Sequence, residues 1–340
     1  AEIGSLQVMR GVLLALRRGI AFRSAESLDR AGRVSSVAFC ARGTLLLGEP
    51  EVTRIDALAG HTNEDVLAFA AGAEASTEHP AATAILRAAR ARGVRPDAVR
   101  SPTPVPGLGV TAVAGSGQAL AVGSRALMLR ERIGVASAET LISDLEAMGR
   151  SVLLVALGGR LIGVIGLQDG LRPGARAAVQ HVLDVGIEPI LLSGDARETC
   201  EAIGRALDID HLRPEVPPSE RGDEVRRLRD GGAVVAVVGR TPNDDSALSA
   251  ADVSIALSAA GSGASEWSVQ LASDDVRDAA YSLRVAHQAW REGQLGLLLI
   301  LAPPVCAVVV SAFGFAPGAL SPIATCLGTL AALARMRPER

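Results

Sequence analysis

Three short segments of the chain carry the side chains that are best suited to chemistry. They are Cys40 to Thr44, Ser193 to Asp195 and Gly239 to Asp245, and together they hold a thiol, hydroxyls, carboxylates and guanidinium groups. A thiol at the end of a strand can act as a nucleophile. More often such a cysteine is a small buried apolar side chain, and we favour this interpretation for Cys40.

Two arginines lie among these polar residues. Arg42 and Arg240 can bind a phosphate group directly, or they can form ion pairs with Asp195 and Asp244 that close the site. Arginine stays protonated at every accessible pH, so either arrangement would hold its positive charge. The sequence leaves both alternatives open.

Each of the three segments follows a short apolar run of the kind found in buried parallel strands. The runs cover residues 34–39, 189–192 and 233–238. Helical spacing of apolar residues appears at 175–185 and 197–207, on either side of the second run. This alternation predicts a doubly wound α/β sheet, in which the three polar segments meet at the carboxyl ends of the strands.

Composition excludes several classes of protein. The 340 residues are 49% hydrophobic and 21% charged, which is enough apolar material for sizeable cores and unlike a disordered chain. With 37 acidic and 34 basic side chains, the net charge of -3 gives no basic field for nucleic acid. Its 4 cysteines are widely separated, which predicts neither a zinc ribbon nor a disulfide framework.

The C-terminal part has the pattern of a membrane hairpin. No charged residue lies between Glu292 and Arg335, and a single helix of that length would measure roughly 63 Å, about twice the hydrocarbon core of a bilayer. We therefore expect two antiparallel spans in lipid, at 295–313 and 319–334, joined by a turn at 314–318. Arginines flank both ends, which predicts a multi-pass membrane protein with its α/β domains in the cytoplasm.

Taken together, the motifs resemble those of a heavy-metal-transporting P-type ATPase, from its C-terminal half, within the haloacid-dehalogenase-like superfamily. Residues 39–45, Phe-Cys-Ala-Arg-Gly-Thr-Leu, stand where that family has F-D-K-T-G-T-L. The other matches are Glu74 with Thr77 to Pro80 for E-x-x-S-E-H-P, Gly107 to Val110 for G-x-G-V, Ser193 to Ala196 for T-G-D-x, Arg221 for a lysine, and Gly239 to Leu248 for G-D-G-I-N-D-x-P-A-L.

The resemblance implies a fold and a division into domains. It implies a haloacid-dehalogenase-like parallel-sheet domain at 24–47 and 167–280, with an α+β nucleotide-binding domain inserted at 48–166. A juxtamembrane helix at 1–23 and a transmembrane helix pair at 281–340 complete this division. The implied catalytic positions are Cys40, Thr44, Ser193, Gly194, Asp195, Arg221, Asn243 and Asp244, and the implied contacts to ATP are Glu74, His79, Gly107 and Gly109.

Several of these positions depart from the family pattern. Cys40 stands at the family's phosphorylated aspartate, and Arg240 stands at one of its magnesium-binding aspartates. Carboxylates are needed both to form an acyl phosphate and to hold Mg²⁺, which demands oxygen ligands. We therefore expect a degenerate pump that binds ATP. It should not bind Mg²⁺, and it should not become phosphorylated.

Two other functions remain open from the sequence. One is an active heavy-metal pump with an unusual active site, and the other is a nucleotide-sensing scaffold subunit in a membrane complex. Upstream transmembrane and actuator segments, or a partner subunit, are the expected partners besides the adenine nucleotide and membrane lipid. Cys306 and Cys326, one in each expected span, are weak candidates for soft-metal ligands, since isolated cysteines also pack in apolar helices.

Overall fold

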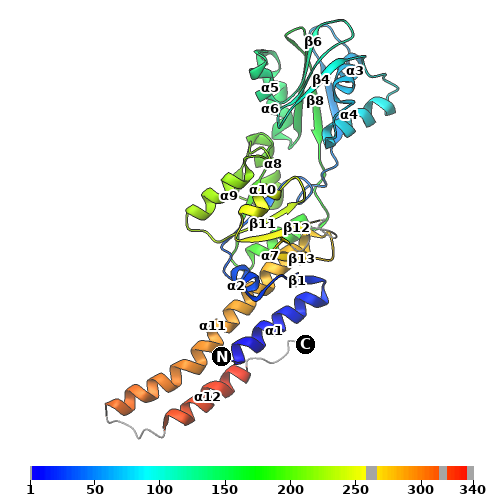
Figure 1. Ribbon diagram of the computed structural model, residues 1–340. Helices are drawn as coiled ribbons and strands as arrows, with labels where there is room; N and C mark the ends of the chain where they lie inside the picture. Colours follow the sequence, from blue (N-terminus) through cyan, green and yellow to red (C-terminus); the bar gives the residue numbers. More distant parts are fainter. Residues whose placement is uncertain (1, 258–265, 314–319, 335–340) are drawn as a thin grey trace.

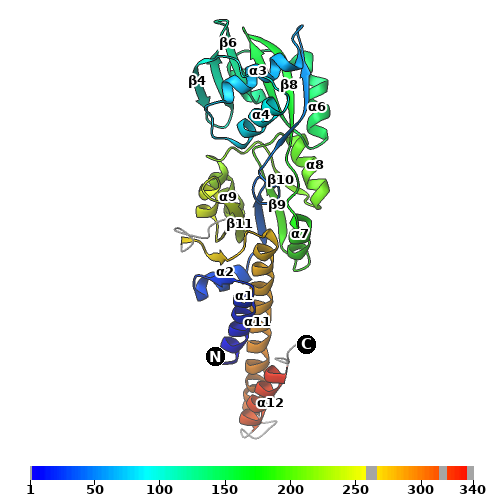
Figure 2. The same ribbon diagram turned by 90° about the vertical axis from the view of Figure 1, so that its right-hand side faces the viewer.

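The computed structural model describes residues 2–257, 266–313 and 320–334. The molecule is elongated and has three tiers (Figure 1). Long helices form one end, a mixed α/β domain lies in the middle, and a second α/β domain forms the other end. The view at right angles shows the same order (Figure 2).

The middle domain is built on a mostly parallel sheet, as the sequence predicted. Among the described residues this sheet has 7 strands in the order β1-β13-β12-β11-β2-β9-β10. Only the edge strand β1 runs antiparallel to its neighbour. The strands are β1 (Ile20–Phe22), β2 (Ser36–Cys40), β9 (Glu188–Leu192), β10 (His211–Arg213), β11 (Val235–Arg240), β12 (Val253–Leu257) and β13 (Val269–Leu271).

Helices cover both faces of this sheet, which makes it doubly wound. The helices are α2 (Ala25–Gly32), α7 (Ala175–Leu183), α8 (Arg197–Leu207), α9 (Arg221–Asp230) and α10 (Asp245–Ala250). Successive residues of β2 point to opposite faces. Val37 and Phe39 join the core that includes residues of α2, α7 and α8. Ala38 and Cys40 join the core under α9 and α10.

The end domain is an insertion in the middle one and has an antiparallel sheet. Its strand order is β3-β8-β7-β6-β5-β4, with α3 and α4 on one face and α5 and α6 on the other. The elements are β3 (Glu51–Ala57), α3 (Asn63–Glu74), α4 (Pro80–Ala91), β4 (Arg100–Val105), β5 (Gly109–Val113), β6 (Ala119–Gly123), α5 (Arg125–Arg130), η1 (Ala136–Ala138), α6 (Glu139–Ala147), β7 (Ser151–Leu157) and β8 (Arg160–Gln168).

Two short segments, side by side, join the inserted domain to the middle one. The Leu47 amide donates to the Gly170 carbonyl at 2.9 Å. The Gly48 amide donates to both carboxylate oxygens of Asp169, at 3.1 and 3.0 Å. These bonds tie the two chain crossings together, so the joint between the domains is narrow.

The remaining tier consists of α1 (Glu2–Arg17), α11 (Val276–Ala312) and α12 (Leu320–Ala334), with α1 and α12 packed against α11 (Figure 1). The helix α11 is long and apolar enough to cross a membrane, and Pro322–Ala331 forms a shorter apolar stretch. The expected turn at 314–318 lies outside the described residues. Pro303 and Pro304 do not interrupt α11. The strand β1 lies within the range expected to be a juxtamembrane helix.

Candidate active site

The three polar segments meet at one edge of the parallel sheet, as the sequence predicted. In the register of the central strands, Cys40 lies opposite Leu192 of β9, and Phe39 lies opposite Val238 of β11. The segments that follow these strands therefore begin at nearly the same level. They bring Cys40, Asp195 and Asp244 to this edge of the sheet, and we call the site formed by the three segments the crevice.

Cys40 is the last residue of β2 rather than the first of the loop, and it is fully buried. Burial raises the pKa of the Cys40 thiol well above its ordinary value, and the negative charge of Asp244 raises it further. The nearby Arg221 opposes this shift but does not cancel it. Because the thiolate is the nucleophilic form, Cys40 is an unreactive thiol at neutral pH.

Asp244 is held by a buried ion pair with Arg221. The two side chains are 1% and 11% exposed, and Arg221 Nη1 donates to Asp244 Oδ1. The other oxygen of Asp244 accepts from the Arg240 amide at 2.7 Å. Gly239 makes room for this carboxylate, since a Cβ there would lie 2.8 Å from the Asp244 Cβ.

Arg240 therefore does not form the ion pair with Asp244 that the sequence allowed. Its side chain crosses the loop after β2, and a Cβ at Gly43 would lie 2.8 Å from Arg240 Cδ. Gly43 has a φ of +79°, a conformation that also favours glycine. The Arg240 guanidinium ends 4.0 Å from Asp274 and its side chain is 40% exposed. The positive charge thus stays at the rim of the crevice.

Arg42 does pair with Asp195, which was one of the two alternatives. Arg42 Nη2 lies 2.5 Å from Asp195 Oδ1. Ser151 and Ser193 donate hydroxyl hydrogen bonds to the same carboxylate, at 2.7 and 2.8 Å. Burial alone would raise the pKa of Asp195, but the charge of Arg42 and these hydrogen bonds outweigh it, and the pKa is lowered. The carboxylate is thus ionised and fully engaged.

Ser151 is a site residue that sequence reasoning missed. It is the first residue of β7 in the inserted domain, and its hydroxyl also accepts from Arg42 Nη2 at 3.0 Å. No local pattern marks it, because its partners lie 44 and 109 residues away in the chain. Only the placement of the inserted domain against the parallel-sheet domain brings them together.

His79 is held in a defined orientation at the start of α4. Its Nδ1 accepts a hydrogen bond from the Ala81 amide at 3.2 Å, which caps the helix. Burial lowers the pKa of His79; Arg42 lowers it further and Asp195 partly opposes this. The neutral ring therefore carries its proton on Nε2, which remains available as a donor. Glu74, at the end of α3, is buried, and burial raises its pKa.

The two predicted glycines lie where β4 turns into β5, on the sheet that α3 covers. Gly109 is required by packing, because a Cβ there would lie 2.2 Å from the Val122 carbonyl oxygen. Gly107 has a φ of +74° and faces the middle domain, where a Cβ would lie 3.5 Å from the Pro217 Cβ. Gly107 thus lies at the junction of the two domains.

Three further predicted residues surround the crevice. Thr44 is buried, and its hydroxyl oxygen has no hydrogen-bond partner among the described residues. Gly194 and Asn243 are both exposed. The polar groups of the crevice thus include one buried hydroxyl that is not engaged.

A family model described as haloacid dehalogenase-like hydrolase matches residues 36–252. The copper-exporting P-type ATPase of Bacillus subtilis (strain 168) is 30% identical over 310 residues, which are 91% of this chain and 38% of that protein. This chain belongs to the heavy-metal P-type ATPases. It contains their catalytic region, and the chain spans 30% to 38% of the length of the curated relatives that it matches.

Solved structures agree with this assignment. A zinc-transporting PIB-type ATPase in its E2.Pi state is similar with a TM-score of 0.60 and 26% identity, over 98% of this chain and 55% of that one. The catalytic domain of the CPx-ATPase CopB-B, described with conformational changes upon nucleotide binding, has a TM-score of 0.61. The CopB-B domain is 24% identical, over 79% of this chain and 96% of its own, so its similarity shows the fold alone.

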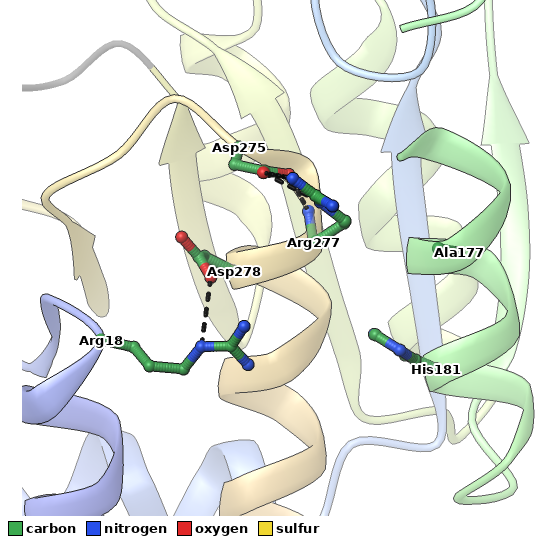
Figure 3. Close-up of a pocket in the computed structure, with 6 residues that line it drawn as sticks. All are labelled: Arg18, Ala177, His181, Asp275, Arg277 and Asp278. Carbon is green, nitrogen blue, oxygen red and sulfur yellow. Dashed lines mark hydrogen bonds and ion pairs between the residues drawn. The ribbon is translucent and has the colours of Figure 1, made fainter. Parts of the chain in front are cut away.

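Two other features of this ATPase region lie outside the crevice. Figure 3 shows a groove of about 500 Å³ lined by Arg18, Ala177, His181, Asp275, Arg277 and Asp278. Its guanidinium groups already pair with its carboxylates. Cys306 and Cys326 are exposed on α11 and α12. The described ranges hold no cluster of three histidine, cysteine or acidic side chains arranged for a metal.

The burial of the thiols predicts how this ATPase region reacts with a maleimide. Cys40 and Cys200 are buried, and burial raises the pKa of Cys200 to about 12. At pH 7, N-ethylmaleimide should leave Cys40 and Cys200 unmodified in the folded protein and should modify them once the protein is unfolded. Peptide mass spectrometry before and after unfolding in guanidinium measures this. Rapid labelling of Cys40 in the folded protein would contradict it.

Proposed function

We propose that this chain is the catalytic region of a degenerate heavy-metal P-type ATPase, one that binds adenine nucleotide and forms no phosphoenzyme. The observation that carries the proposal is the fully buried Cys40 at the carboxyl end of β2, where the family has its phosphorylated aspartate. An acyl phosphate can form only on a carboxylate. A protonated, buried thiol offers neither that chemistry nor a thiolate to replace it.

The crevice also fits a magnesium ion poorly. Both oxygens of Asp244 accept hydrogen bonds, from Arg221 and from the Arg240 amide. The carboxylate of Asp195 is likewise engaged by Arg42 and two hydroxyls. Mg²⁺ needs free oxygen ligands and is repelled by nearby cations. We therefore expect no magnesium here.

Nucleotide contact is proposed for the face of the inserted domain that bears Glu74, His79, Gly107 and Gly109. His79 offers an Nε2–H donor whose orientation is fixed by the bond to Ala81. Gly107 has no side chain and leaves the backbone of its turn open to a flat ring.

The remaining parts of the proposal concern the membrane and the rest of the pump. We take 48–166 as the nucleotide-binding domain, 24–47 and 167–280 as the phosphorylation-type domain, and α1, within 1–23, as the juxtamembrane helix. Residues 281–340 then form a membrane helix pair that keeps both α/β domains in the cytoplasm. Metal binding and actuator function would come from upstream segments or from a partner subunit.

One experiment on the full chain tests both halves of the function. With γ-labelled ATP and Mg²⁺, followed by an acid quench, the protein should carry no label above background. The Bacillus subtilis relative serves as the positive control. In the same preparation, ATP should bind with a measurable heat in titration calorimetry.

Variants separate nucleotide contact from general effects. His79→Gln should weaken ATP binding roughly tenfold, as expected when one hydrogen bond of about 1.4 kcal/mol is lost. The control is His211→Gln. His211 is an exposed histidine of the middle domain, where it pairs with Glu188, and this variant should bind ATP like the parent protein. Acid-stable label that disappears in Cys40→Ala would refute the degenerate pump, and unchanged binding in His79→Gln would refute the nucleotide face.

A further inference from the structure

The inserted domain touches the middle domain through a small polar cluster. Ser151, at the start of β7, places its hydroxyl between Arg42 and Asp195 of the middle domain, at 3.0 and 2.7 Å. Arg42 itself lies 2.5 Å from Asp195. One serine of the inserted domain thus hydrogen-bonds to both members of an ion pair that belongs to the middle domain.

This cluster is shielded from water. The Asp195 side chain is 5% exposed and that of Arg42 is 30% exposed. A charged pair in such surroundings is screened little by salt, and the loss of one partner leaves the other charge buried and uncompensated. Separation of the domains breaks the two hydrogen bonds of Ser151 to this pair, and hydrogen bonds to charged groups are stronger than those between neutral groups.

Neighbouring contacts lie beside the same cluster. The Thr199 hydroxyl, on α8, donates to the Arg150 carbonyl at 3.1 Å. The helix α6 lies along α8, and a Cβ at Gly149 would touch Ala202 at 3.4 Å. Gly107 of the inserted domain also approaches the middle domain, where a Cβ would lie 3.5 Å from the Pro217 Cβ. Domains of one chain that meet through such contacts usually move relative to one another.

The joint between the domains allows such movement. The chain crosses between them only twice, near Gly48 and near Asp169, and these crossings are bonded to each other. Two short adjacent crossings of this kind can act as a hinge for domain closure. The angle between the two domains is then set by contacts away from the joint.

We propose that Arg42 is a latch residue that holds the inserted domain closed over the crevice in the absence of nucleotide. Its guanidinium binds Asp195 on its own domain and Ser151 on the other, so the bond to Ser151 is lost when the domains separate while the ion pair with Asp195 remains. Truncating Arg42 removes the bond to Ser151 and leaves Asp195 buried without a counter-charge in the closed form. It should therefore raise the ratio of open to closed molecules roughly 30-fold, the equivalent of about 2 kcal/mol.

The test measures the distance between the domains in the full chain in detergent, without nucleotide. Fluorophores are attached to ketone-bearing amino acids at Arg160, on the β7–β8 turn, and Arg226, on α9, both of which are exposed. The parent protein should give one narrow population in single-molecule energy transfer. Arg42→Ala should give mainly a broad population at longer distance, and Ser151→Ala, which removes both hydrogen bonds across the contact, should shift in the same direction.

Arg30→Ala is the matched control, because Arg30 forms an exposed ion pair with Glu26 at 2.6 Å, away from the domain contact. It should leave the distance unchanged. If Arg42→Ala does not fold, Ser151→Ala decides, since it removes only a hydroxyl. A parent-like distribution in every folded variant of the cluster would overturn the latch. ATP is absent throughout, so the result is independent of the proposed nucleotide site.

Discussion

Replacing Arg221 by methionine should lower the free energy of unfolding of the parallel-sheet domain by about 3–5 kcal/mol. The Arg221 and Asp244 side chains are 11% and 1% exposed, so the substitution leaves a buried carboxylate with no counter-charge. The Arg240 amide would remain as its donor, but one neutral hydrogen bond does not offset the loss of a cation. Methionine keeps most of the packing volume, so the loss reports on charge.

Tryptophan fluorescence can follow this domain alone. Trp267 is buried in the same core as Cys40 and Leu248, and a Trp290→Phe background removes the other tryptophan of the chain. The double variant with Asp244→Asn should recover at least half of the lost stability, because no unpaired charge is then buried. Arg226→Met, on the same helix with an exposed partner, is the control. If Arg221→Met cost no more than this control, the pair would not be a buried charge pair.

The parts of the fold that are local in the sequence could be predicted. The strands β2, β9 and β11 are runs of branched residues bounded by turn residues, and they lie within two residues of the predicted ranges. The start and end of α8 match those predicted, because apolar spacing marks the helix. The convergence of the three polar segments followed from topology, since parallel strands end at one edge of a sheet.

Which charges pair in the crevice could not be predicted. Asp244 pairs with Arg221, 23 residues away, and not with the nearby Arg240. The backbone of Arg240 decides which arginine pairs with Asp244. Its amide donates a hydrogen bond to Asp244, while its side chain lies against Gly43 and points away from this carboxylate. Likewise Ser151 joins Asp195 only because the inserted domain is closed. Distances of this kind are set by tertiary packing, and hydrophobic patterns do not record them.

Restoring a carboxylate with Cys40→Asp should still leave the chain without acid-stable label from γ-labelled ATP. The new side chain would be fully buried beside Asp244, and these are the same two causes that raise the pKa of the thiol now present. Burial and a like charge both disfavour ionisation, so much of the new aspartate would be the neutral acid, which is a poor nucleophile. Any ionised fraction would compete with Asp244 for Arg221.

The rest of the crevice also opposes the reaction in this variant. Arg240 remains at the rim and Arg42 remains bound to Asp195, so no oxygen ligand is freed for a cation that could neutralise the transferred phosphoryl group. The assay compares Cys40→Asp with Cys40→Ser, which matches the size of the thiol and cannot form an acyl phosphate. We expect both variants to carry the same amount of acid-stable label, no higher than background. Magnesium-dependent label in Cys40→Asp alone would mean that position 40 by itself decides activity, and the arginines of the crevice would then have no part in its loss.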